Sequence, residues 1–162
     1  MLDDSGTYLR SEVMAATGAT RGQIAGLLDY CISQQGHSHG ALHRWPRDEI
    51  VLASVALKLA RLGILLSTVK AAVDAVRSLH EAGELEVVML TFDAAGRFVA
   101  ATRLDRRVAL LGELTEPAEA PAGVQVLIDV GAVSRTVDAK LQAHRADHGA
   151  AHRGPKAWRK AA

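Results

Sequence analysis

The sequence predicts an α+β protein in which a helical N-terminal half is followed by a small three-stranded module and a basic tail. Apolar residues recur at helical spacing up to Leu79. After Gly83 the pattern changes to short apolar runs separated by turns, which is typical of strands. We therefore expect three parts, which are residues 1–82, residues 83–141 and residues 142–162.

Two short helices joined by a glycine turn are expected near the N-terminus. Ser11 is placed to cap the first helix, since its hydroxyl can accept from first-turn amides, and Gly18 can end that helix. Thr20 is followed three residues later by Gln23, which is the spacing of a capping box and starts the second helix. The second helix then has four apolar positions at helical spacing, Ile24, Leu27, Leu28 and Cys31.

The second helix of such a hairpin is a candidate for DNA binding. A helix-turn-helix places its second helix in the major groove, which is about 12 Å wide. Thr20, Arg21 and Gln23 lie at the end that would face DNA, and the arginine and glutamine can contact phosphates or base edges. Three small neighbouring residues would let the helix backbone approach the DNA closely, namely Gly22, Ala25 and Gly26. The same spacing also fits a helical hairpin that has no DNA partner.

A polar stretch and two longer helices complete the N-terminal half. Residues 34–42 suit a short β-wing or a mobile loop, and Arg44, which follows them, can reach a phosphate or the minor groove. A helix is expected over residues 46–62, because it opens with a proline and two acidic residues and is stopped by Gly63. Ser67 then caps a fourth helix. The apolar face of the 46–62 helix is Ile50, Leu52, Val55, Leu59 and Leu62.

Four segments of this half resemble the mercury-resistance regulator (MerR) family and its short bacterial and phage relatives, which are winged helix-turn-helix proteins. These segments are residues 8–13, 17–20, 44–50 and 62–69, and the resemblance covers roughly the first half of the chain. It implies a winged helix whose second helix enters the major groove and whose wing contacts the DNA backbone. It also implies a dimer on an inverted repeat.

The candidate DNA contacts lie within or beside these segments. Arg21, Gln23 and Arg44 are the leading candidates, with Thr20 at the start of the second helix. Contacts to phosphates are expected from three further cations, which are Arg10, Arg47 and Lys70.

The chain departs from the family at three points. The family usually places an arginine and tyrosines in the second helix, where this chain has Ala25, Gly26 and Leu27. Cys31 is the only cysteine, so a metal sensor that uses several thiolates is not expected. Gly83 and strand-like residues stand where the family has its long dimerisation helix, so the mode of dimerisation does not carry over.

The second half is expected to form a small α/β module with three strands. Residues 85–92 and 97–102 pair as a hairpin, a linker covers 115–123, a third strand covers 124–130, and a final helix covers 131–141. The exposed edge of this sheet is the preferred dimerisation element, because an unpaired edge can bind a second chain. The alternative is that the module is a simple lid over the core of one monomer.

The segment 142–162 has five cations against one carboxylate, Asp147, and so has a net charge of +4 in a chain whose total is +1. A basic tail adds phosphate affinity that does not depend on sequence and weakens with salt. The alternative is a tail that only keeps the chain in solution. The five cations are Arg145, Arg153, Lys156, Arg159 and Lys160.

No catalytic site, metal site or cofactor is expected. The chain has no phosphate-binding glycine loop and no nucleophile elbow, and Asp93, Asp105 and Asp129 near the strand ends are explained by turns and caps. Three histidines recur every four residues, a spacing able to bind a metal on a helix, and they are His144, His148 and His152. Gly149 and Gly154 argue against a helix there.

Composition limits the remaining classes. With 162 residues, of which 49% are hydrophobic, the chain can bury one good core or two small ones. The single cysteine fits a reducing cytoplasm, and no apolar run approaches the ~20 residues of a membrane span. We therefore expect a cytoplasmic protein that binds double-stranded DNA, a dimeric transcriptional regulator whose effector, a small molecule or a protein, is left open. The alternative is a phage or nucleoid-type architectural or packaging protein that forms a larger oligomer on DNA.

Overall fold

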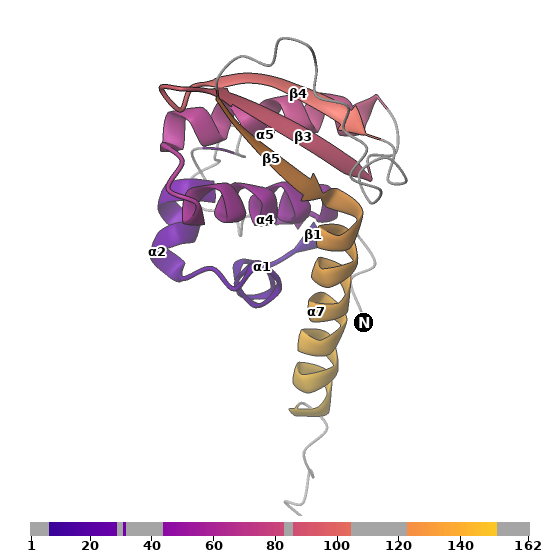
Figure 1. Ribbon diagram of the computed structural model, residues 1–162. Coiled ribbons are helices and arrows are strands. Elements are labelled where there is room, and N and C mark those ends of the chain that lie inside the picture. The colour runs from indigo at the N-terminus through magenta and orange to yellow at the C-terminus, as the bar shows by residue number, and fades with distance from the viewer. Residues whose placement is uncertain (1–6, 29–30, 32–43, 83–85, 105–122, 152–162) are drawn as a thin grey trace, which may run out of the picture.

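The computed structural model describes residues 7–28, 31, 44–82, 86–104 and 123–151. Its helices are α1 (Arg10–Thr17), α2 (Arg21–Gln23) with a π-helical turn after it (Ile24–Leu28), α4 (Arg47–Arg61), α5 (Leu66–Glu81) and α7 (Val130–Ala151). Its strands are β1 (Thr7–Tyr8), β2 (Trp45–Pro46), β3 (Val87–Asp93), β4 (Phe98–Leu104) and β5 (Gly123–Asp129). The larger sheet lies over α5 and α4, and α7 runs from β5 down past α4 and α1 (Figure 1). The expected α+β class is confirmed.

The helical hairpin has the glycine stop and the capping box that its sequence predicts. Gly18 ends α1 with a left-handed backbone, φ 67°, and its N–H donates to the Met14 carbonyl at 2.9 Å. At the start of α2 the Thr20 N–H donates to Gln23 Oε1 at 2.9 Å, and the Gln23 N–H donates to Thr20 Oγ1 at 3.3 Å. These reciprocal bonds satisfy two amides that a helix start otherwise leaves unpaired.

Two predicted N-caps are wrong. Helix α1 begins one residue before Ser11, and its first turn is closed by Glu12, whose carboxylate accepts from the Leu9 N–H at 2.7 Å. Ser67 lies inside the first turn of α5, and Leu65 precedes that helix with an extended backbone and no side-chain cap. In both cases the chain enters the helix earlier than the serine, so the hydroxyl is not at the capping position.

Helices α4 and α5 lie within one or two residues of their predicted bounds, separated by Gly63 at φ 81°. Four of the five predicted α4 core residues are buried, but the prediction for Leu62 is wrong, because its side chain is 63% exposed. Leu62 follows the last helical residue, where the chain already turns toward Gly63. On α5 the buried positions include Val69, Val73 and Val76, as its helical period predicts.

The predicted three-stranded sheet is confirmed, with the strand order β4-β3-β5 and antiparallel pairing throughout. Its inner face is set by alternation along β3, where Val88, Leu90 and Phe92 are buried. Strand β5 continues this face, because Ile128 pairs with Val88. Since β3 is the central strand, β4 and β5 each have an outer edge with no neighbouring strand among the described residues.

The last helix is longer than predicted. It was expected to end at Leu141, but α7 continues to Ala151, so the first ten residues of the expected tail, 142–151, are helical and Gly149 does not stop them. Its Val133, Val137 and Leu141 recur every four residues and are buried. They belong to one hydrophobic core that also contains residues of α1, α4, α5 and the sheet. The C-terminal module therefore packs on the N-terminal half of its own chain.

Several predictions concern residues outside the described ranges, namely the stretch 34–42, the linker up to residue 122, Asp105, His152 and the tail cations Arg153, Lys156, Arg159 and Lys160. None of the helices that are described is long and apolar enough to cross a bilayer.

Candidate nucleic-acid interface

Helix α2 presents a small polar surface to solvent. Ile24 anchors it, being completely buried against α4, while the residues around it face outward. The segment 18–26 contains no carboxylate, so nothing within it would repel a phosphate. The exposed positions are Arg21, Gly22, Gln23, Ala25 and Gly26.

Arg21 and Gln23 differ in how much hydrogen-bonding capacity they have left. Arg21 makes no hydrogen bond or ion pair to any described residue, so its five N–H donors are available to a ligand. The side-chain oxygen of Gln23 is already used by the Thr20 N–H, which leaves its amide NH₂ group to donate. Arg21 is therefore the side chain of α2 best suited to bind an anion, and Gln23 also fixes the start of the helix.

Arg10 is the first residue of α1, at the opposite end of that helix from α2, and Arg44 directly precedes β2. Strand β1 pairs with β2 in the register Tyr8 to Trp45, which brings Arg44 opposite the residue before Arg10. Both arginines are exposed, and both also make contacts within the protein. The predicted contacts thus form two separate groups, one on α2 and one beside the β1–β2 ribbon.

Arg47 joins α4 to α7. Its Nε donates to Asp138 Oδ1 at 2.8 Å and its Nη2 donates to Asp138 Oδ2 at 2.7 Å, while Ser134 and Asp48 accept further hydrogen bonds from the same guanidinium. The hydrogen bonds from Arg47 lower the pKa of the Asp138 carboxyl below its ordinary value. A residue predicted to bind a phosphate therefore holds two helices together.

Lys70 is also paired within the protein. Its ammonium lies 2.9 Å from Asp74 Oδ2, one turn further along α5, and Arg77 binds the other oxygen of the same carboxylate at 2.9 Å. A phosphate would have to compete with this intrahelical network.

Arg145, predicted to lie in a flexible tail, fastens α7 to the N-terminus. Its guanidinium carbon stacks 4.5 Å from the centre of the Tyr8 ring, and its Nε donates to Glu12 Oε1 at 3.0 Å. Burial opposes the charge of Glu12, but hydrogen bonds from the Leu9 N–H and from Arg145 outweigh it and lower the pKa of Glu12. This predicted tail cation therefore has structural partners within the protein.

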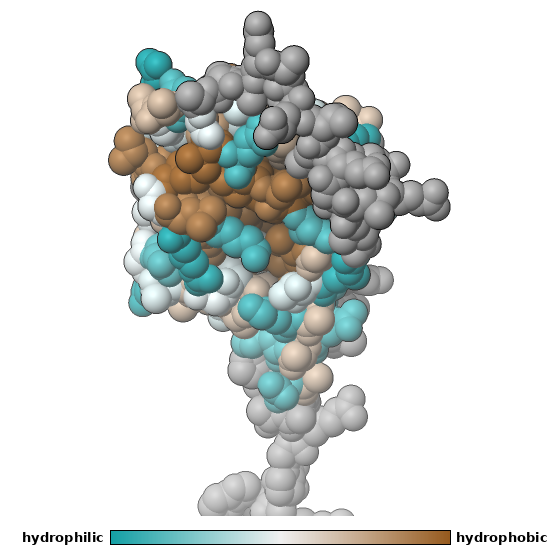
Figure 2. Space-filling view, viewed as in Figure 1, coloured by the Kyte–Doolittle hydropathy of each residue, from teal (hydrophilic) through white to brown (hydrophobic). Residues whose placement is uncertain are grey.

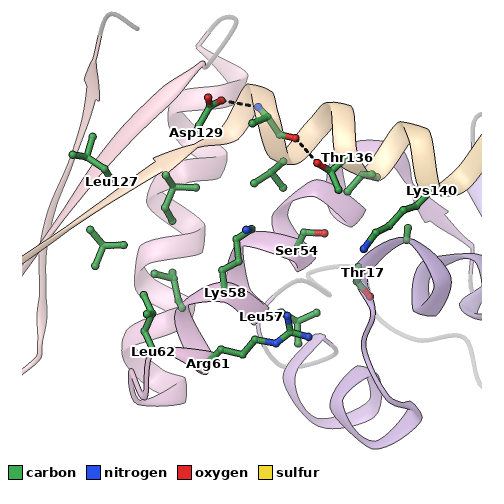
Figure 3. Close-up of a pocket in the computed structure, with 17 residues that line it drawn as sticks. Thr17, Ser54, Leu57, Lys58, Arg61, Leu62, Leu127, Asp129, Thr136 and Lys140 are labelled. Atoms are coloured by element: carbon green, nitrogen blue, oxygen red, sulfur yellow. Dashed lines mark hydrogen bonds between the residues drawn. The ribbon is translucent and has the colours of Figure 1, made fainter. Parts of the chain in front are cut away.

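Three cations that were not among the predicted site residues line a cavity of about 620 Å³. Lys58 and Arg61 extend into it from α4, and Lys140 extends from α7 toward Thr17 at the end of α1 (Figure 3). The spacing of Lys58 and Arg61 places them on one face of α4. The contribution of Lys140, 79 residues after Arg61, has no signal in the sequence.

Two of the aspartates near strand ends have structural roles. Asp93 accepts from the Arg97 and Ala95 amides in the β3–β4 turn, and its hydrogen bonds with Arg97 lower its pKa. Asp129 accepts from the Ala132 N–H at 2.6 Å and so caps α7. Cys31 is buried, which raises the pKa of its thiol. Within the described ranges, no three side chains of metal-binding type come together.

Comparison of the sequence with protein-family models and with curated proteins finds no match. The case for a function therefore depends on the residues and their geometry.

Proposed function

We propose that this chain binds double-stranded DNA sequence-specifically, with a MerR-like winged helix-turn-helix in residues 1–82, and acts in the cytoplasm as a dimeric transcriptional regulator. The observation that carries the proposal is α2, a capped helix after a left-handed glycine. It exposes Arg21, which has no partner among the described residues, and small residues around it, so its backbone can approach a groove closely.

The surroundings of α2 support the same proposal. Core packing holds α2 at a fixed angle, because Ile24 is buried and the turn before it is fastened by Thr17, whose hydroxyl donates to the Val13 carbonyl at 2.7 Å and accepts from the Ala19 N–H at 3.2 Å. A rigid support is what direct readout of base edges needs. The β1–β2 ribbon adds Arg10 and Arg44 as backbone contacts at the other end of α1.

Arg21→Ala tests the proposal. A duplex is first selected from a random library by binding to the full chain, and the affinities of both proteins for it and for a random duplex are then compared. If Arg21 reads a base edge, the variant loses about 1 to 3 kcal/mol on the selected duplex and much less on the random one. The matched control is Arg135→Ala, which removes from α7 an exposed cation that, within the described ranges, also has no partner. Failure to select any duplex would refute the proposal.

A DNA architectural or packaging protein is the second candidate. The observation that favours it is the set of large apolar side chains on the surface, because a larger assembly would bury them. Light scattering coupled to size exclusion separates the two candidates: a regulator is a dimer with one defined site, and an assembly protein forms larger oligomers with little sequence preference. The most exposed of these side chains are Leu62, Leu65 and Val124.

A further inference from the structure

The cavity of about 620 Å³ lies where both halves of the chain meet. Its walls come from the last turn of α1, one face of α4, strand β5 and the first half of α7. Cavities of roughly 300 to 1,000 Å³ are the size that small ligands occupy in proteins. Because elements from both halves of the chain form it, the cavity exists only in the folded chain.

One part of the cavity wall is cationic. Lys58, Arg61 and Lys140 line it, all three are exposed, and none of them pairs with any residue that the structure describes. Among the described residues of the wall, the one carboxylate belongs to Asp129, and it caps α7 at the Ala132 amide. This described part of the wall therefore has a net positive charge. By contrast, Arg47 and Arg145 on neighbouring surfaces are neutralised by carboxylates.

The other part of the wall is apolar and incompletely covered. Val126 and Leu127 of β5 line it together with Leu62 at the end of α4, and Leu62 and Leu127 are 63% and 47% exposed. Figure 2 shows a hydrophobic patch on the face that carries β5, with hydrophilic side chains along its lower border. The hollow is thus amphipathic, with apolar residues on β5 and at the end of α4, and cations on α4 and α7 (Figure 3).

We infer that this cavity binds an amphipathic anion, namely a carboxylate carried on an aliphatic body. The carboxylate takes charge-assisted hydrogen bonds from the lysine and arginine side chains. The aliphatic body covers the exposed Leu62 side chain and the neighbouring Val126, which are stabilised by leaving water. A DNA phosphate suits the site less well, because the cations share a concave wall with apolar side chains that a duplex backbone would leave in water.

The ligand would also touch the turn that positions α2. Ala16 and Thr17 line the cavity, and Thr17 holds the chain between α1 and α2 through its bonds to Val13 and Ala19. A bound carboxylate therefore acts on the helix that we propose reads DNA, which makes it an effector. Only this regulatory consequence rests on the proposed function; binding itself does not.

Isothermal titration calorimetry of the full chain with sodium decanoate, below its micelle concentration, tests the site without DNA. We expect saturable binding of one decanoate per chain and none of decyltrimethylammonium, which has the same body and the opposite charge. Lys58→Ala combined with Lys140→Ala should weaken decanoate at least about tenfold. Leu62→Gln should weaken it several-fold, and Arg135→Ala, outside the cavity, should leave it within about twofold. All of these side chains are exposed, so the variants should keep the wild-type thermal melt.

Three results would overturn the inference. They are no saturable binding of decanoate, equal binding of the two amphiphiles, and an affinity that the double lysine variant leaves unchanged. If that variant instead weakens binding to random and selected duplexes alike while decanoate binding persists, the lysines belong to the DNA interface. Loss of decanoate binding with intact DNA binding, or the reverse, separates the failure of the site from the failure of the proposed function.

Discussion

Arg47 and Asp138 fix the second half of the chain to the first. The contact is made at two points between the start of α4 and the middle of α7. The two side chains are 39% and 38% exposed, so solvent screens their attraction. Exposed pairs contribute up to about 1 kcal/mol, and the two-point geometry places this pair near that limit.

Asp138→Asn should therefore lower the free energy of unfolding by about 1 kcal/mol at about pH 7. The pKa of Asp138 is lower in the folded chain because of Arg47. The stabilisation is thus complete above the unfolded-state pKa of about 3.9 and is lost as the pH falls through the folded-state pKa. Urea unfolding at about pH 7 and about pH 2 measures this.

The control for this variant is Asp147→Asn, which removes from the same helix an exposed carboxylate that pairs with no described residue, and it should leave the free energy of unfolding unchanged. Wild type and Asp138→Asn should differ near neutral pH and converge in acid. A difference of equal size at both pH values would assign the effect to packing rather than to charge.

At the scale of one element, a substitution in helix α2 should affect stability and DNA binding in opposite directions. A Cβ on Gly22 meets nothing within 4 Å, so the fold has room for alanine. Alanine is favoured over glycine within a helix by about 1 kcal/mol, so Gly22→Ala should raise the thermal stability or leave it unchanged. If the α2 backbone approaches a groove as proposed, the added methyl should weaken specific DNA binding at the same time.

Thermal melts and affinity for the selected duplex measure the two effects of Gly22→Ala. Because the variant is at least as stable as wild type, lower affinity cannot be ascribed to unfolding. The matched control is Gly96→Ala, which adds a methyl in the β3–β4 turn; there φ is 73°, so stability falls while DNA binding stays. Unchanged DNA binding of Gly22→Ala would place α2 away from the duplex.

The elements that could be predicted are those with local signals. The α1–α2 turn follows from Gly18 and the Thr20–Gln23 spacing, and the β3–β4 hairpin follows from two runs of strand length on either side of a glycine turn. The extension of α7 could not be predicted. A sequence pattern shows the local cost of glycine in a helix at Gly149, but it does not show the contact between Arg145 and Tyr8, because those two residues lie far apart in the chain. That contact helps to hold α7 against the N-terminal residues.

The candidate site is harder to predict than the elements. Arg47 and Asp138 are 91 residues apart, so a sequence pattern shows two unrelated surface charges where the structure has one contact. Lys140 likewise has no visible relation to Lys58 until β5 turns α7 back along α4. The exposure of Arg21 could be predicted, because it follows from the helical period of the apolar residues after it. Of the predicted contacts on α2, Arg21 is the one whose side chain is left to bind a ligand.

At the scale of the whole molecule, the outer edge of β5 lies beside exposed apolar side chains. The net charge of +1 gives little repulsion between copies. Strand β5 offers seven residues of unpaired edge among the described strands, and Val124 beside it is 63% exposed. A strand edge alone binds weakly, but an edge flanked by apolar side chains can hold a second copy.

Val124→Lys should convert the proposed dimer to a monomer, because pairing through β5 would bring two ammonium groups into an apolar contact. Since Val124 is exposed, the stability of the monomer should change by no more than about 0.5 kcal/mol. The control is Val99→Lys on β4, at the other edge of the sheet and 52% exposed, which should leave the dimer intact. Light scattering coupled to size exclusion over a range of concentrations measures both. A wild type that stays monomeric, or a dimer that survives Val124→Lys, would exclude β5 as the dimer interface and leave the two copies to meet through another surface or on DNA alone.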